Sequence, residues 1–442
     1  MAALFVAAIV VNLLKPGPPG PIRLRRPAAT ACTQHWVGSW AASPSGVSLT
    51  QPLANQTVRM IVAPHLAGRS LRLHFTNRHG LAPVTLGAVT VGLRGPNASL
   101  VPGSERAALV RGPNASLVPG SERRVTFGGQ SSVVIPVGAD AVSDPVKLGF
   151  DPFQDLAVSV YLPGTVTHPV EHFATRQTSY LSPTGSGDRS AQVGASAFTQ
   201  TTTGKFSTGW YFLDGVDVLA PGPAGAVIAF GDSLTDGYQA RRNGSEQLAT
   251  IDTNGRYPDD LARRLIAAKI PLSVLNAGIG GDQLLRSGVP TYGLSGLSRF
   301  GTDALGQSGV TDVIVLMGIN DIALRATASQ LIAAYEQLIS RAHAAGVAIQ
   351  LGTLMPSTGT PSPAYGDAAA TSVREQVNQW IRTQRFSDGI IDFDAAVRDP
   401  RDPSVINPAY NGGDSLHLDL AGYDAMARAV DLASLARPNC IQ

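Results

Sequence analysis

The sequence is poor in cysteine, with two residues in a chain of 442. It has neither a Cys-x-x-Cys pair nor a Cys/His cluster, so no zinc site is expected. Cys32 and Cys440 stand near the two ends of what would be the mature chain, and in an exported protein such a pair could join the termini. Two unrelated thiols remain the alternative, because spacing does not fix connectivity.

Charged residues are also few. They make up 15% of the chain, and 34 basic residues nearly balance 32 acidic ones, so the basic surface that nucleic-acid binding needs is absent. The apolar fraction of 44% excludes a disordered chain, and 442 residues exceed what a single core usually supports. We therefore expect two packed domains and a substrate that is small, uncharged or bound inside the protein.

The N-terminus has an apolar run at residues 2–14 that is too short to cross a bilayer comfortably. It resembles the core of a signal peptide, and Ala29-Thr30-Ala31 offers a cleavage site. Residues 1–31 are thus predicted to be a signal peptide or a disordered N-terminus of a protein that is secreted or located in the cell envelope. A lipoprotein acylated at Cys32 is a weaker alternative, because Ala29 replaces the usual apolar residue.

Residues 32–220 show a period of two. Short alternating runs such as Val58, Met60, Val62 are separated by turn residues, which favours an all-β sandwich or jelly-roll-like domain. Within it, residues 94–106 are repeated at 111–123, and one copy is expected to loop out of the sheet.

Residues 221–442 have a different pattern, which begins after the Pro/Gly-rich residues 221–225. Short, almost uninterrupted apolar runs alternate with helical segments, which is typical of a parallel sheet buried on both faces. The pattern predicts a three-layer α/β/α domain with a parallel five-stranded sheet, whose strands are Ala226–Phe230, Leu272–Asn276, Val313–Met317, Val347–Leu351 and Ile390–Phe393. A covering helix is predicted over residues 331–342 and ends before Gly346.

A serine directly follows the first predicted strand, in the string Gly231-Asp232-Ser233-Leu234. Ligands of open parallel sheets bind beyond the carboxyl ends of the strands, so Ser233 would face substrate. A helix beginning near it would direct its dipole and a backbone N–H at a developing oxyanion. A plain turn that contains serine explains the string equally well when it is taken alone.

Residues 221–442 contain two histidines that could act as the base that a serine nucleophile needs. His343 stands in the last turn of the predicted helix, where it can satisfy terminal carbonyl groups. His417 stands in Asp414-Ser415-Leu416-His417 after the last strand, where Asp414 can orient the imidazole. A solvated loop that caps the helix from Leu420 onward is the plainer alternative.

Two further segments follow the second and third strands. The glycine block 276–282 lets backbone N–H groups approach a ligand, and Gly318-Ile319-Asn320-Asp321 offers the Asn320 amide as a donor. Each could be a plain turn. All four segments fall at strand ends on one edge of the sheet, which plain turns do not require.

Together the four segments resemble the sequence blocks of the SGNH, or GDSL, hydrolase family over roughly residues 226–435. The resemblance implies that Ser233 is the nucleophile, that His417 is the base held by Asp414, and that the oxyanion hole consists of Ser233, Gly281 and Asn320. Gly280 competes with Gly281 because the glycine is doubled. The family hydrolyses carboxylic esters of short acyl groups, lipids and acylated sugars, without metal or organic cofactor.

Two other functions remain open at this point. A binding protein could hold a polysaccharide or envelope component with its β domain while the α/β domain is catalytically silent. An acyltransferase would share the acyl-enzyme and differ only in what removes the acyl group.

Overall fold

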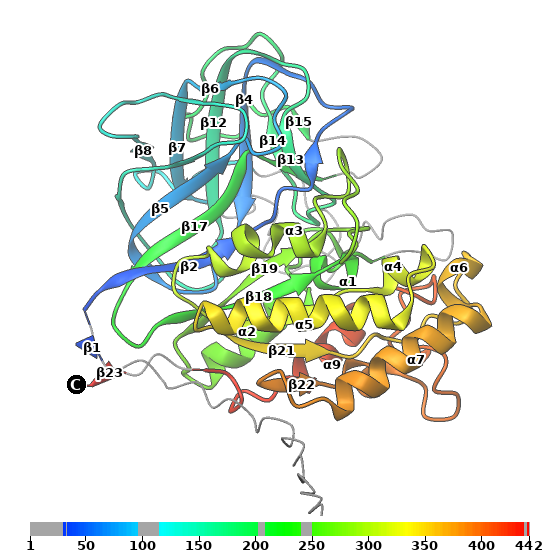
Figure 1. Cartoon of the computed structure of the whole chain (residues 1–442). Helices are drawn as coiled ribbons and strands as arrows, with labels where there is room; N and C mark the ends of the chain where they lie inside the picture. Colours follow the sequence, from blue (N-terminus) through cyan, green and yellow to red (C-terminus); the bar gives the residue numbers. More distant parts are fainter. Residues whose placement is uncertain are drawn as a thin grey trace, which may run out of the picture.

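The computed structural model describes residues 30–31, 33–95, 115–201, 208–239, 250–436 and 440–441. The first and last described strands, β1 (Thr30–Ala31) and β23 (Cys440–Ile441), pair in parallel with Thr30 opposite Cys440 (Figure 1). The signal peptide and the Cys32–Cys440 bond fall outside the described residues and side chains, and both stay predictions.

The β-rich part lies at the top of Figure 1 and consists of antiparallel sheets, as the period of two predicts. One sheet has the order β10-β5-β17-β2, with β11 also paired to β5, and a larger sheet has the order β15-β14-β4-β12-β7-β8. Their bounds are β2 (His35–Ala41), β5 (Gly68–Thr76), β10 (Asp140–Val142), β11 (Val146–Phe150) and β17 (Leu213–Ala220) for the first, and β4 (Leu53–Val62), β7 (Ala88–Leu93), β8 (Arg123–Val125), β12 (Leu156–Val166), β14 (Tyr180–Leu181) and β15 (Gln200–Thr201) for the second. Smaller sheets join β3 (Gly46–Val47), β13 (Val170–Phe173) and β16 (Gly209–Tyr211), and β6 (Val84–Leu86) with β9 (Val133–Ile135).

Alternate residues of β4 and β5 pack into the same core. Met60 and Val62 of one strand and Leu71 and Leu73 of the other are fully buried in one apolar cluster, because successive side chains of a strand point to opposite faces. Within the duplicated segment, the end of the second copy pairs through β8 with β7. One of the two copies was expected to loop out, and this stays a prediction because residues 96–114 lie outside the described residues.

The second part contains the predicted parallel five-stranded sheet, in the order β19-β18-β20-β21-β22. Each strand lies within three residues of its expected bounds: β18 (Gly225–Gly231), β19 (Leu272–Gly278), β20 (Val310–Leu316), β21 (Ala348–Gly352) and β22 (Gly389–Ile391). Every residue of β18, which lies between β19 and β20, is buried. This is expected for a strand with helices on both faces of its sheet.

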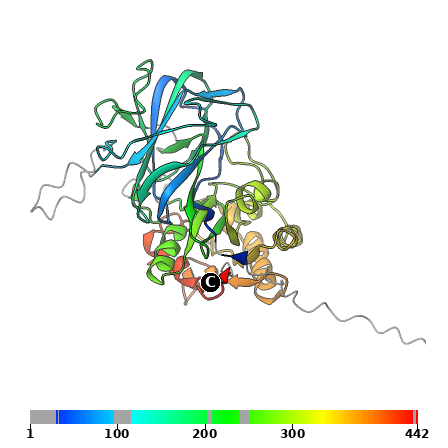
Figure 2. The ribbon, with the colours of Figure 1, turned by 90° about the vertical axis from the view of Figure 1, so that its left-hand side faces the viewer.

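Helices cover both faces of this sheet (Figure 2). The green and red helices, α2 and α9, contact each other on one side, and α3, α5 and α7 form contacts on the other. The helices are α1 (Ser233–Asp236), α2 (Tyr257–Ala267), α3 (Gly296–Phe300) with the π-helical turn Gly301–Leu305, α4 (Ile319–Ala323), α5 (Ala328–Ala344), α6 (Pro363–Gly366), α7 (Ala368–Thr383), α8 (Phe393–Val397) and α9 (Leu420–Ala429). Among the described residues, none of the helices combines the length and apolarity needed to span a membrane.

The two parts are closely joined. Residues 221–224 connect β17 directly to β18, and most of the buried apolar side chains of both parts belong to one cluster. Polar contacts cross between them as well: Gly38 N–H donates to Ser308 O at 2.8 Å, and His65 Nδ1 lies 2.6 Å from Val274 O. The division into domains at residues 32–220 and 221–442 stays a prediction.

Gly278 at the end of β19 lies against α1, and a Cβ atom there would come within 2.3 Å of Asp236 N. Since that neighbour is backbone, Gly278→Ala forces α1 or β19 to shift, and we expect a loss of about 1–3 kcal/mol in the free energy of unfolding. Urea denaturation measures it. Gly149→Ala is the control because a Cβ at Gly149 meets nothing within 4 Å. Equal stability of the two variants would contradict this close contact.

Candidate active site

Ser233 is the first residue of α1, directly after β18. Asp232 is the N-cap of α1, and its Oδ1 accepts a hydrogen bond from Leu234 N–H at 3.0 Å, which fixes the turn that carries the serine. The helix expected here is only four residues long. Its dipole therefore contributes little, and what it provides is mainly the orientation of the first-turn backbone N–H groups.

The His417 imidazole connects Ser233 to Asp414. Its Nε2 lies 2.8 Å from Ser233 Oγ, and its Nδ1 lies 2.7 Å from Asp414 Oδ2. The Tyr238 ring and the imidazole pack in a T-shaped arrangement, with 5.0 Å between ring centroids. The structure thus brings together the three side chains that sequence predicts as nucleophile, base and acid, in the order that base catalysis requires.

Asp414 is held by its own loop. Its Oδ1 accepts hydrogen bonds from the backbone N–H of Leu416 at 3.0 Å and of His417 at 2.8 Å. Burial raises the pKa of Asp414, but the contact with His417 and these backbone donors outweigh burial and leave the pKa below its ordinary value. The carboxylate is therefore ionised at neutral pH and can orient the imidazole and stabilise its protonated form.

The predicted oxyanion donors follow the neighbouring strands β19 and β20. Gly281 has a φ of +77°, in the left-handed region that favours glycine. Asn320 Nδ2 donates to Asp282 O at 2.7 Å, which joins the two donor segments. Of the two glycines, Gly281 is the one whose backbone requires glycine; its role and that of Asn320 stay predictions.

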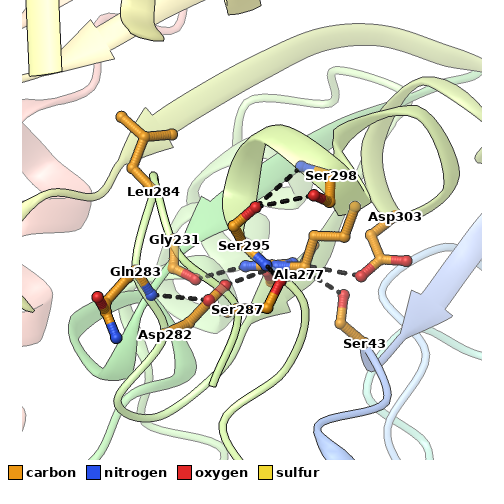
Figure 3. Close-up of polar contacts among 12 residues, drawn as sticks. Ser43, Gly231, Ala277, Asp282, Gln283, Leu284, Ser287, Ser295, Ser298 and Asp303 are labelled. Atoms are coloured by element: carbon orange, nitrogen blue, oxygen red, sulfur yellow. Dashed lines mark hydrogen bonds and ion pairs between the residues drawn. The ribbon is translucent and has the colours of Figure 1, made fainter. Parts of the chain in front are cut away.

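An arginine that sequence reasoning missed holds these strand ends together. Arg299 donates through Nε to Asp282 Oδ2 at 2.7 Å, through Nη1 to Ala277 O at 2.8 Å and through Nη2 to Gly231 O at 2.8 Å. Figure 3 shows Gly231, Ala277 and Asp282 gathered around these contacts. Arg299 directly precedes Phe300 and has Asp303 four residues later as a possible partner, which is a weak signal for a buried cation.

The β-rich part also reaches the site. His172 Nε2 on β13 lies 3.1 Å from Asp236 Oδ1 on α1, and its Nδ1 lies 2.6 Å from Ser43 O. The next residue, Phe173, packs edge-on against Tyr292 at 5.9 Å between centroids, and Tyr292 lies beside Gly281. No sequence pattern indicated these contacts, because they join segments more than 60 residues apart.

The other candidate base has a structural role. His343 near the end of α5 lies 2.9 Å from Asp388 Oδ2 through its Nε2. Its partner is thus a carboxylate in the loop before β22, in place of the terminal carbonyl groups that we expected. Among the described residues, no cluster of three or more His, Cys, Asp or Glu side chains is arranged to hold a metal ion.

Residues 229–425 match the GDSL-like lipase/acylhydrolase family. Solved structures with similarity include the native aryl esterase of M. smegmatis, at 17% identity over 47% of this chain and 96% of that chain with a TM-score of 0.38. Others are Est24, a carbohydrate acetylesterase from Sinorhizobium meliloti, at 16% over 46% and 95% with a TM-score of 0.37, and a lipase/acylhydrolase from Enterococcus faecalis, at 20% over 46% and 92% with a TM-score of 0.35. No curated protein matches the chain.

Asp232 is expected to make stability depend on pH. Burial raises the pKa of its carboxyl group to about 7, against about 3.9 in an unfolded chain. Because the pKa is higher in the folded state, protonation of Asp232 stabilises the fold. This contribution is complete below about pH 3.9 and is lost as the pH rises through about 7. Asp232→Asn keeps the N-cap acceptor without the charge, so we expect its melting temperature to exceed that of the wild type at pH 8.

The measurement is thermal unfolding at pH 5 and pH 8. We expect the melting temperature of Asp232→Asn to exceed that of the wild type by more at pH 8 than at pH 5. Each kcal/mol gained in the free energy of unfolding raises the melting temperature by roughly 2–4 °C. Asp419→Asn is the control, because Asp419 caps α9 in the same way at a partly exposed position. A gain that is the same at both pH values would mean that Asp232 does not titrate in this range.

Proposed function

We propose that this chain, whose residues 229–425 match the GDSL-like lipase/acylhydrolase family, hydrolyses carboxylic esters through an acyl-enzyme on Ser233. The observation that carries the proposal is the unbroken contact from Ser233 Oγ through the His417 imidazole to Asp414, at 2.8 and 2.7 Å. A hydroxyl becomes a competent nucleophile when a base at this distance accepts its proton.

In the first step, Ser233 Oγ attacks the ester carbonyl carbon while His417 Nε2 takes the hydroxyl proton. The carbonyl π electrons move to oxygen and form a tetrahedral oxyanion. The C–O bond to the alcohol then breaks, and His417 returns the proton to the leaving oxygen. Asp414 stabilises the imidazolium throughout and keeps its own charge. Water repeats the path, with His417 as base, and releases the acid and free Ser233.

The oxyanion is stabilised by the Ser233 and Gly281 backbone N–H groups and by Asn320 Nδ2. Fixed donors of this kind lower the barrier because they need no reorganisation when the charge forms, and each contributes about 3–4 kcal/mol. Substrates in this proposal are short acyl esters, lipids or acylated sugars, and the reaction uses no cofactor or nucleic acid. Signal-like residues 1–31 support a secreted or cell-envelope location.

The first test is Ser233→Ala with p-nitrophenyl acetate as substrate. We expect hydrolysis to fall to the background rate, because the reaction loses its nucleophile, while the circular dichroism spectrum and melting temperature stay near those of the wild type. Asp414→Asn should reduce the rate less than Ser233→Ala. Ser329→Ala, at an exposed position of α5, should keep full activity. Turnover retained by Ser233→Ala would refute the assignment.

The β-rich part has a role in this function through His172. Asp236 lies three residues after the nucleophile, is 3% exposed, and has His172 Nε2 as its partner at 3.1 Å. Removing the His172 side chain would leave the buried Asp236 carboxyl group without this partner. We therefore expect α1 to shift. Displacements near 1 Å at a reacting group can reduce rates by about 100-fold. The β-rich part is therefore proposed to support the nucleophile turn directly.

His172→Ala is expected to lower kcat about 10-fold or more. The matched control is His65→Ala, because His65 makes the same kind of link between the parts, with Nδ1 at 2.6 Å from Val274 O and Nε2 at 3.1 Å from Asp259, but Asp259 belongs to α2 and not to α1. Both variants should lose stability in thermal unfolding. Equal kcat values for the two variants would show that His172 affects only stability.

A further inference from the structure

The Asn320 side chain is fixed at both ends. Its Nδ2 donates to the backbone carbonyl of Asp282 at 2.7 Å, and its Oδ1 accepts from the Tyr365 hydroxyl at 2.9 Å. A carbonyl oxygen can only accept, so the NH₂ end must face Asp282, and the tyrosine must therefore be the donor. These two contacts define which way the amide points.

The orientation matters because an amide has two opposite ends. A carboxamide rotated by 180° would turn Oδ1 toward the oxyanion, and two negative oxygens would repel each other. In the observed orientation one Nδ2 hydrogen is used by Asp282 O, and the second is available for the substrate. Resting on the proposed function, we propose that Tyr365 is a positioning residue that holds Asn320 as an oxyanion donor.

The fold places Tyr365 firmly for this task. It lies on the short helix α6, and its backbone carbonyl accepts a hydrogen bond from Ser357 Oγ at 2.7 Å. The next residue is Gly366, where a Cβ atom would come within 2.3 Å of Ser357 O. The segment from Ser357 to Gly366 therefore closes tightly on itself and carries the tyrosine to α4, where Asn320 begins the helix with Ile319.

The surroundings keep the tyrosine hydroxyl a donor. Burial raises the pKa of Tyr365 above its ordinary value, and the nearby acidic groups of Asp232, Tyr292 and Asp414 add to the shift. The hydroxyl thus stays protonated over the working range of an esterase. By donating to Oδ1, the hydroxyl also polarises the amide. This strengthens the hydrogen bond that the amide N–H donates to a developing anion.

This support is expected to act mainly in the transition state. The substrate carbonyl carries little charge before attack, and the oxyanion carries a full one, so a better oriented and more polarised donor changes kcat more than KM. A hydrogen bond of this kind is worth roughly a factor of 3 to 10 in rate. Loss of the donor itself, in Asn320→Ala, is expected to cost about 100-fold or more.

The test is a double-mutant cycle with p-nitrophenyl acetate, using Tyr365→Phe, Asn320→Ala and the double variant. Tyr365→Phe removes only the hydroxyl and should lower kcat about 3- to 10-fold, with KM changed less than about 2-fold. In the Asn320→Ala background the same substitution should have no further effect, because there is no amide left to orient. The matched control is Tyr161→Phe, since Tyr161 donates to Asn55 Oδ1 at 2.7 Å in the β-rich part.

The outcomes separate the two proposals. If Asn320→Ala keeps full activity, the oxyanion assignment in the proposed function fails. If Asn320→Ala loses activity but Tyr365→Phe equals Tyr161→Phe, the role of Tyr365 alone is overturned. The same conclusion follows if Tyr365→Phe lowers kcat by the same factor in both backgrounds, because a general structural effect would not depend on the amide.

Discussion

One contact sets the requirements for the rest of the molecule: a single imidazole must touch a hydroxyl that lies 184 residues earlier in the chain. The parallel sheet meets this requirement because its strands all end at one edge. β18 delivers Ser233 there, and the loop before α9 delivers His417. Asp414 comes from the same loop as the base, only three residues away, so two of the three side chains are placed by local geometry.

Buried charged contacts fix the segments around this edge. Arg299 joins the end of β18, the end of β19 and the Asp282 carboxylate, while His172 reaches α1 from the β-rich part. Buried charges are costly without partners, and removing one partner typically costs 3–5 kcal/mol. Such contacts therefore contribute less to net stability than to holding one defined arrangement, which is what fixed oxyanion donors require.

Sequence patterns predicted much of this arrangement. The five strands could be recognised because each is a short buried run, and Ser233 because it directly follows the first of them. Asp414 and His417 could be recognised because their block resembles one of the SGNH hydrolase family. Arg299, His172 and Tyr365 could not be found in the same way, since each acts on residues more than ten positions distant and lies in no recognisable motif. The short length of α1 was not predicted, although Gly237, which ends it in a left-handed conformation, is a sequence signal for a helix end.

In the β-rich part too, the strands could be predicted from sequence but their contacts with the other part could not. Its period of two indicated antiparallel sheets, because alternation follows from the pleat itself. Its contacts with the α/β part depend on which strand faces which loop, and no local pattern encodes that. The short polar links at His65 and His172, together with the shared apolar cluster, join this part to the α/β part.

The most direct measurement of the central claim is labelling of the whole chain with a fluorophosphonate, followed by peptide mass spectrometry. Only a serine activated by a base reacts readily with such a probe. We expect one adduct per chain, located on Ser233, and a strong decrease in labelling for His417→Ala. Labelling that is absent under conditions where the protein is folded, or that falls on another residue, would contradict the claim.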